Sequence, residues 1–202
     1  YHPGDSTRES TVIIGDSAMR HAWYLDPNPG WTTQNLWAGG APTGGGGHAG
    51  TPDPTSGHTG PYVYGYNLNG DYGNNPPDED LTTGAIDCTG MFGTRLRFWR
   101  WAGVEDPLHD KISVWASADS ISWTNVWENA TEICDTSWVF MDVDISRVAD
   151  NEPAVHLRWR IGPTDGANRY CGWNIDDVEI WGMTADPQPV VEGLAIETGR
   201  PN

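Results

Sequence analysis

The chain has 202 residues, with 25 glycines, 15 prolines, 12 tryptophans and seven tyrosines. Turn-forming residues and large polar-edged rings at this density favour a β-sandwich over a helix bundle. The formal charge of −17, from 28 acidic against 11 basic residues, excludes nucleic acid and anionic membranes as good partners, because such a surface repels them. Such a surface attracts cations instead. No apolar run reaches the 18 residues that a membrane-spanning helix needs.

Short segments in which apolar and polar residues alternate recur between turn signals, and helical periodicity is almost absent. In residues 94–101, for example, Leu96 and Phe98 fall on one face of the predicted strand. Many short strands joined by polar turns predict an all-β fold, an antiparallel β-sandwich of the jelly-roll kind. The predicted strands are 11–15, 61–67, 94–101, 111–117, 122–127, 138–145, 154–160 and 173–181.

Residues 39–60 interrupt this pattern, because they are too rich in glycine and proline for regular structure. His48 and His58 lie ten residues apart in this segment, which is a weak metal signal, and we interpret the segment as a solvated loop. The composition changes again after Trp181. We therefore expect an extended segment at 1–19, a β-jelly-roll domain at 20–182, and a proline-containing linker with a strand-like tail at 183–202.

The tail holds a strand-prone segment, VVEGLAIE, with Val190, Leu194 and Ile196 on one side and Val191 on the other. Alone in water such a strand cannot bury enough apolar area to offset its chain entropy. Docked on the open sheet edge of another copy, it gains a hydrogen-bond ladder and side-chain pockets. The tail therefore predicts self-assembly into a filament or layer.

The three cysteines, Cys88, Cys134 and Cys171, have no CxxC spacing, so a zinc site is not expected. Three disulfide pairings are possible, and the sequence alone does not choose among them. Cys88 follows a strand-like segment and Cys171 opens the last predicted strand, so both can lie at one end of the sandwich. We predict a Cys88–Cys171 disulfide with Cys134 free. The chain begins at Tyr1, without Met or a signal segment, as a processed secreted protein does.

Several segments resemble bacterial extracellular β-jelly-roll modules of the cleaved-adhesin and MAM-like type, which are appended to secreted proteases and surface adhesins. These segments are PTSGHTGPYVYGYNLNGDY, LTTGAIDCTG, LRFWRWAGVE, HDKISVWAS and CGWNIDDVEIWG, within about residues 20–182. The resemblance implies a non-catalytic module that serves adhesion, assembly or substrate targeting. It also implies calcium, because several such modules hold a structural calcium ion between the N-terminal region and the last strand.

Two adjacent carboxylates, Asp176 and Asp177, interrupt the apolar run of the last predicted strand. If Val178 and Ile180 face the core, alternation places Asp176 on the same side. A buried carboxylate needs a cation, an arginine or backbone N–H groups. Asn69 and Asp71 supply further oxygen atoms in a turn, so we predict a structural calcium ion held by Asn69, Asp71, Asp176 and Asp177. A structural Asp paired with arginine is the alternative.

Alternation also places Trp99, Trp101 and Trp115 on the faces opposite the core. Exposed tryptophans are stacking platforms for glycans, so these three residues form a possible aromatic binding face. The alternative is that a loop or another sheet covers them and that they pack as ordinary structural residues.

An enzymatic interpretation starts from GDS at residues 15–17, with Ser17 as the nucleophile of an esterase and Asp106 and His109 as its partners. The helices of that α/β fold are missing from the pattern, and strands follow His109 for some ninety residues, so we expect no enzyme. The sequence favours a secreted, calcium-stabilised structural subunit that assembles with copies of itself at the cell surface. The alternative is an adhesion or glycan- or protein-targeting module of a larger secreted protein.

Overall fold

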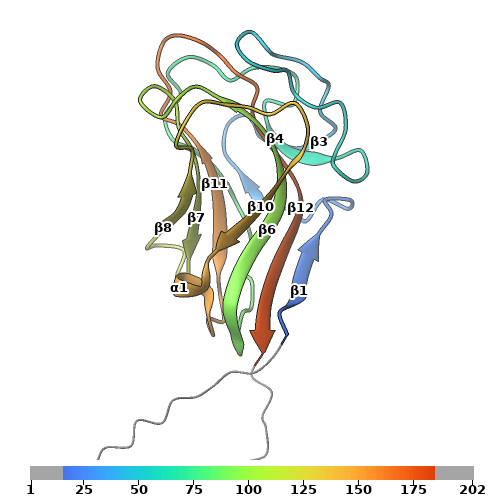
Figure 1. Ribbon diagram of the computed structural model, residues 1–202, viewed down its shortest axis with the longest axis vertical. Helices are drawn as coiled ribbons and strands as arrows, with labels where there is room; N and C mark the ends of the chain where they lie inside the picture. Colours follow the sequence, from blue (N-terminus) through green and yellow to red (C-terminus); the bar gives the residue numbers. More distant parts are fainter. Residues whose placement is uncertain (1–15, 185–202) are drawn as a thin grey trace, which may run out of the picture.

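Two antiparallel sheets pack face to face in the computed structural model, which describes residues 16–184 (Figure 1). The seven-stranded sheet has the order β10-β6-β12-β4-β3, with β1 on β12 and β9 on β6, and the five-stranded sheet has the order β2-β5-β11-β7-β8. The strands are β1 (Ala18–Trp23), β2 (Thr32–Thr33), β3 (Trp37–Gly40), β4 (Val63–Tyr66), β5 (Glu79–Thr82), β6 (Met91–Val104), β7 (Ile112–Ser117), β8 (Thr124–Glu128), β9 (Ile133–Cys134), β10 (Val139–Asp144), β11 (His156–Ile161) and β12 (Gly172–Thr184). The predicted all-β sandwich is confirmed; within 16–184 the helix is one short turn, α1 (Ser146–Ala149).

The core lies between the sheets, where the predicted alternation holds. Leu96 and Phe98 of β6 are fully buried, and the Phe98 ring packs edge-on against Trp159 of β11 at 5.6 Å. Trp31 and Tyr64 extend this stack, with Trp31 parallel to both Tyr64 and Trp159. The chain has a modest apolar content, but its large aromatic side chains bury enough area to fill the core.

Strands β6 and β12 run most of the length of the sandwich side by side, and the loops gather at one end (Figure 1). Strands β1, β2, β3, β5 and β9 were not predicted, because each is short or contains glycine and polar residues that weaken the alternation signal. The predicted strand 11–15 and the tail residues Val190, Val191, Leu194 and Ile196 lie outside the described residues. Assembly through the tail, like the proposed domain boundaries, stays a prediction.

Residues 41–62 are not a solvated loop, because they lie across the outer face of the seven-stranded sheet. Trp101 of β6 donates from Nε1 to the Pro52 carbonyl at 3.0 Å, and the His58 ring stacks on Trp99 at 3.8 Å. Gly50 packs closely against Cys134 near the far edge of this face, since a Cβ atom on Gly50 would lie 2.8 Å from the Cys134 Sγ atom. We call residues 41–62 the cover loop.

The predicted Cys88–Cys171 disulfide is wrong, since all three cysteines are free. Cys88 precedes β6, where its carbonyl accepts from the Met91 N–H, and Cys171 packs against Gly103 near the other end of that strand. Twelve strand residues separate these positions by about 40 Å, whereas a disulfide needs Cα atoms within about 7 Å. Cys134 and Cys171 flank β6 on opposite sides, two strand spacings or about 9–10 Å apart, which is also too far.

None of the helices in the described part of the chain is long and apolar enough to cross a membrane.

Candidate functional site

The acidic pair of β12 fastens the cover loop to the sheet. Asp176 accepts hydrogen bonds from the backbone N–H groups of Thr59 and Asp177, at 3.1 and 2.7 Å. Asp177 accepts from the Thr59 hydroxyl at 2.5 Å and contacts His58 Nδ1 at 2.6 Å. Asp176 is fully buried, and this burial raises its pKa to about 6. The pair therefore has a structural role.

A β-bulge decides which way Asp176 points. Ile175, Val178 and Ile180 all face the core, although alternation cannot place both odd and even positions there. The register shifts between Asp176 and Glu179, and Asp177 has a φ of +46°, which few residues other than glycine adopt. The expectation that Asp176 shares the side of Val178 is wrong for this reason: the bulge turns Asp176 to the outer face, beneath the cover loop.

A second buried polar pair lies beneath the same loop. Asn174 of β12 donates from Nδ2 to Asp53 Oδ1 at 2.7 Å. Asp53 Oδ2 and Asn174 Oδ1 are buried and have no hydrogen-bond partner among the described residues. Burial is the main cause that raises the pKa of Asp53 to about 7.

The four residues predicted to hold calcium do not converge. Asp71 accepts from the backbone N–H groups of Gly47 and His48, at 2.7 and 3.1 Å, whereas Asp176 and Asp177 bind residues 58 and 59. The backbone carbonyl of Asn69 packs against Gly45, since a Cβ atom on Gly45 would lie 2.3 Å from the Asn69 oxygen. Asp71 and the Asp176–Asp177 pair thus bind different parts of the cover loop, and they do not form a convergent group of ligands within residues 16–184. The predicted ligand set therefore does not assemble, and calcium itself stays a prediction.

Another group of carboxylates fits a hard cation better. Glu105, Asp110 and Asp165 bring one oxygen each to within 4.8 Å of one another, the only such group of His, Cys, Asp and Glu side chains in residues 16–184. Asp110 is fully buried, and burial followed by the charges of Asp165 and Glu105 raises its pKa. Glu105 Oε2 is sealed from solvent without a hydrogen-bond partner. The Tyr72 hydroxyl and the Asp165 N–H donate to Asp110, so Glu105 Oε2 is the oxygen left without a donor. Ca²⁺ takes oxygen ligands, which this group offers.

The three predicted aromatic residues do not form one binding face. Trp99 and Trp101 belong to the seven-stranded sheet, beneath His58 and Pro52 of the cover loop. Trp115 belongs to the five-stranded sheet, where Arg160 lies 5.4 Å from its ring centroid. The alternative interpretation, that a loop covers Trp99 and Trp101, is the correct one.

The esterase arrangement does not form either. Ser17 precedes β1, next to the beginning of β6, and Asp106 and His109 follow the end of β6. The fourteen residues of this strand separate the two ends by about 45 Å. His109 contacts Asp165 instead, at 3.1 Å.

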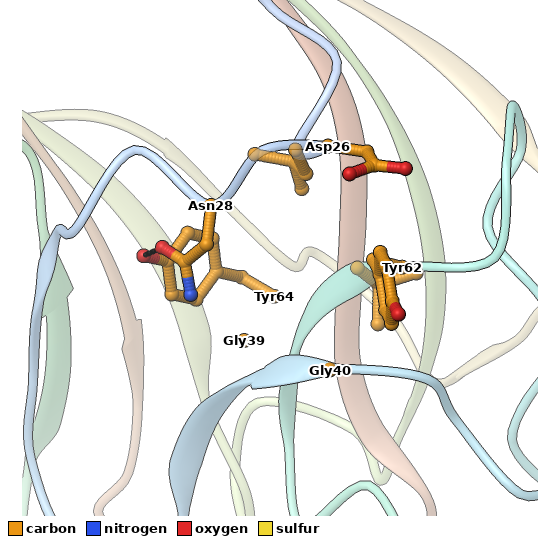
Figure 2. Close-up of a pocket in the computed structure, with 8 residues that line it drawn as sticks. Asp26, Asn28, Gly39, Gly40, Tyr62 and Tyr64 are labelled. Carbon is orange, nitrogen blue, oxygen red and sulfur yellow. Dashed lines mark hydrogen bonds between the residues drawn. The ribbon is translucent and has the colours of Figure 1, made fainter.

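A pocket of about 140 Å³ lies beside the turn that follows β1 (Figure 2). Asp26 and Asn28 come from this turn, and Tyr62 precedes β4. Figure 2 shows the Asp26 carboxylate on the side of Tyr62, and the Asn28 amide beside Tyr64. Tyr62 is 43% exposed, which leaves its ring available at the rim. The complete lining is Leu25, Asp26, Asn28, Gly39, Gly40, Tyr62, Val63 and Tyr64.

Hydrogen bonds fix the Asn28 amide. Its Oδ1 accepts from the Tyr64 hydroxyl at 2.5 Å and from the Gly30 N–H at 2.8 Å. Nδ2 donates to no atom of the described residues and lies 2.5 Å from where a Cβ of Gly39 would stand. Any side chain at Gly39 would therefore displace this amide. The pocket combines a free donor, a carboxylate acceptor and a half-exposed ring.

Sequence reasoning missed this pocket, although WYLDPNPGW (23–31) carries a signal. Asp, Asn, Pro and Gly between two tryptophans indicate a fixed polar turn. The other wall comes from β3 and β4, which the turn meets only in the folded chain.

No known family model matches the sequence, and a search of curated proteins finds no match either. By fold, the chain is similar to the K1 cleaved adhesin domain of Lys-gingipain from Porphyromonas gingivalis, with 16% identity and a TM-score of 0.50 over 82% of this chain and 98% of that domain. It is also similar to the CBM22-1 xylan-binding domain from Paenibacillus barcinonensis Xyn10C, with 10% identity and a TM-score of 0.51 over 87% of this chain and 99% of that domain.

These similarities define the class of fold: a jelly-roll β-sandwich, the architecture of adhesin and carbohydrate-binding modules. The resemblance to cleaved-adhesin modules that the sequence predicted is confirmed at the level of the fold.

Proposed function

We propose that this protein is a non-catalytic, extracellular adhesion or carbohydrate-targeting module that binds a neutral glycan in the pocket of Asp26, Asn28 and Tyr62. The observation that carries the proposal is the unused Asn28 Nδ2 donor, held in place beside the exposed Tyr62 ring. Such modules share this fold, and one of the similar domains is named for binding xylan.

The chemistry of the pocket suits a sugar. A sugar ring has C–H groups that pack on an aromatic face and hydroxyls that both donate and accept. Tyr62 offers the face, Asn28 offers the donor, and Asp26 accepts. Because Asn28 is already fixed by Tyr64 and Gly30, binding costs little side-chain entropy. The chain's charge of −17 and the carboxylate of Asp26 favour neutral over anionic sugars.

Affinity electrophoresis in gels that contain a neutral polysaccharide tests this proposal, with xylan, mixed-linkage glucan and galactan as the probes. We expect at least one of them to retard the protein, and anionic polygalacturonate to leave it unretarded. Tyr62→Ala should weaken binding at least tenfold, because it removes the ring. Phe140→Ala is the matched control, an aromatic residue that is 49% exposed outside the pocket. Equal loss in both variants, or no retardation by any neutral glycan, contradicts the proposal.

Calcium stabilisation is also a proposal. The residues that fit it are Glu105, Asp110 and Asp165, rather than the set expected from the sequence. An ion there would connect the β6–β7 loop with the β11–β12 loop and neutralise three facing carboxylates. Self-assembly through residues 190–196 is the other function that the sequence favoured, and it stays a prediction.

A further inference from the structure

The turn after β1 borders more than one cavity. A second cavity of about 440 Å³ is lined by Ala22, Trp23, Tyr24, Asp26, Pro27, Asn28 and Pro29. It shares Asp26 and Asn28 with the pocket described above. The same two polar side chains therefore border both cavities.

Each cavity has its own half-exposed tyrosine: Tyr62 is 43% exposed in the first, and Tyr24 is 50% exposed in the second. The Tyr24 hydroxyl lies 3.8 Å from the Met19 sulfur of β1, so the ring is held at its outer end as well as at the backbone. Each cavity therefore offers a sugar the same groups: one tyrosine ring, and the side chains of Asp26 and Asn28.

We infer that the two cavities are adjoining subsites and that the ligand is a polysaccharide chain rather than a single sugar. This inference rests on the proposed function. One sugar unit would contact Tyr62, the next would contact Tyr24, and Asp26 and Asn28 would bind hydroxyls on both sides of the linkage between them. A single sugar would leave the larger cavity and the Tyr24 ring unused.

The turn between the subsites is held rigidly, which suits an extended ligand. The Asn28 side chain accepts from the Gly30 N–H, and Tyr64, which holds Asn28, itself accepts from the Trp31 N–H at 2.9 Å. Pro27 and Pro29 restrict the backbone on both sides of Asn28. The position of the Asn28 amide between the two tyrosines is therefore set before binding, which lowers the entropy cost of binding there.

Calorimetric titration with gluco- and xylo-oligosaccharides of one, two, four and six units tests the inference on the full chain. We expect affinity to rise about tenfold or more from one unit to four, as the second ring becomes engaged. Tyr24→Ala should remove this gain. Tyr24→Phe keeps the ring and should keep the gain, while Tyr62→Ala should weaken the binding of every length.

The outcomes separate this inference from the proposed function. If Tyr62→Ala weakens binding while one unit and four units bind alike and Tyr24→Ala changes nothing, the two-subsite inference is wrong and the proposed function stands. If Tyr62→Ala leaves all affinities unchanged, the proposed function fails and the inference fails with it. Circular dichroism of each variant identifies any loss of binding that comes from unfolding.

Discussion

Two groups of carboxylates in this molecule have different surroundings. Beneath the cover loop, Asp176 and Asp177 accept from backbone N–H groups, a hydroxyl and a histidine, all within 3.1 Å. At the loop-rich end, Glu105, Asp110 and Asp165 face one another, and no arginine or lysine within 16–184 forms an ion pair with them. The second group also accepts hydrogen bonds, from Tyr72, His109 and Asn168 among others. It differs in that three carboxylates converge and that Glu105 Oε2 is buried without a hydrogen-bond partner among the described residues.

The surroundings of a carboxylate, rather than its position in a motif, decide what it does. A buried carboxylate must find donors or a cation, because burial without either costs several kcal/mol. Where a loop supplies N–H groups, the carboxylate fastens that loop. Where three carboxylates converge and one buried oxygen has no donor, a cation can complete the set.

The largest effect that we expect is on the pH dependence of stability. Burial raises the pKa of Asp53 to about 7 and of Asp176 to about 6 in the fold. Since the folded state then binds more protons than the unfolded state, stability should fall as pH rises from about 4 to about 8. Asp53 alone contributes at most about 4 kcal/mol to this fall, at 1.36 kcal/mol per pKa unit.

Urea denaturation at pH 5 and pH 8 measures this effect, with Asp53→Asn as the informative variant. The amide cannot ionise, so the variant should lose most of the difference between the two pH values. A midpoint that is equal at both pH values in the wild type, or higher at pH 8, would contradict the role of burial at Asp53.

The next effect is on the fastening of the cover loop. Asp176→Ala leaves the N–H groups of Thr59 and Asp177 without an acceptor, and should cost about 3 kcal/mol of unfolding free energy. Asp144→Ala is the control, because that side chain is 64% exposed and should cost less than about 1 kcal/mol. Limited proteolysis should cleave the Asp176→Ala variant within residues 41–62 first. Equal stability of the two variants would mean that the loop is held by its aromatic contacts alone.

The sequence predicted the strands whose alternation is regular, such as 94–101 and 111–117, and hence the sandwich. It also singled out Asp176 and Asp177, but neither their orientation nor their partners, because a bulge reverses the alternation at Asp177. The partners, His58 and Thr59, come from a loop more than a hundred residues away. The pocket could not be predicted for the same reason, since the turn after β1 meets the wall formed by β3 and β4 only in the folded chain.

The smallest effect is that of calcium on thermal stability, and it tests the second group of carboxylates directly. If Glu105, Asp110 and Asp165 hold the ion, a chelator should lower the melting temperature, and excess Ca²⁺ should restore it. A free concentration ten times Kd contributes about 1.4 kcal/mol by ligand linkage, which is a shift of roughly 3–6 °C for a domain of this size. Asp110→Asn should abolish the response, because it removes the charge of the fully buried member of the group. Asp177→Asn should keep the calcium response, because that carboxylate binds His58 and Thr59 of the cover loop and lies outside the group.

A response lost in Asp177→Asn and kept in Asp110→Asn would move the ion to the last strand, where the sequence first suggested it. An unchanged melting curve in chelator would mean that the three carboxylates are stable without a cation.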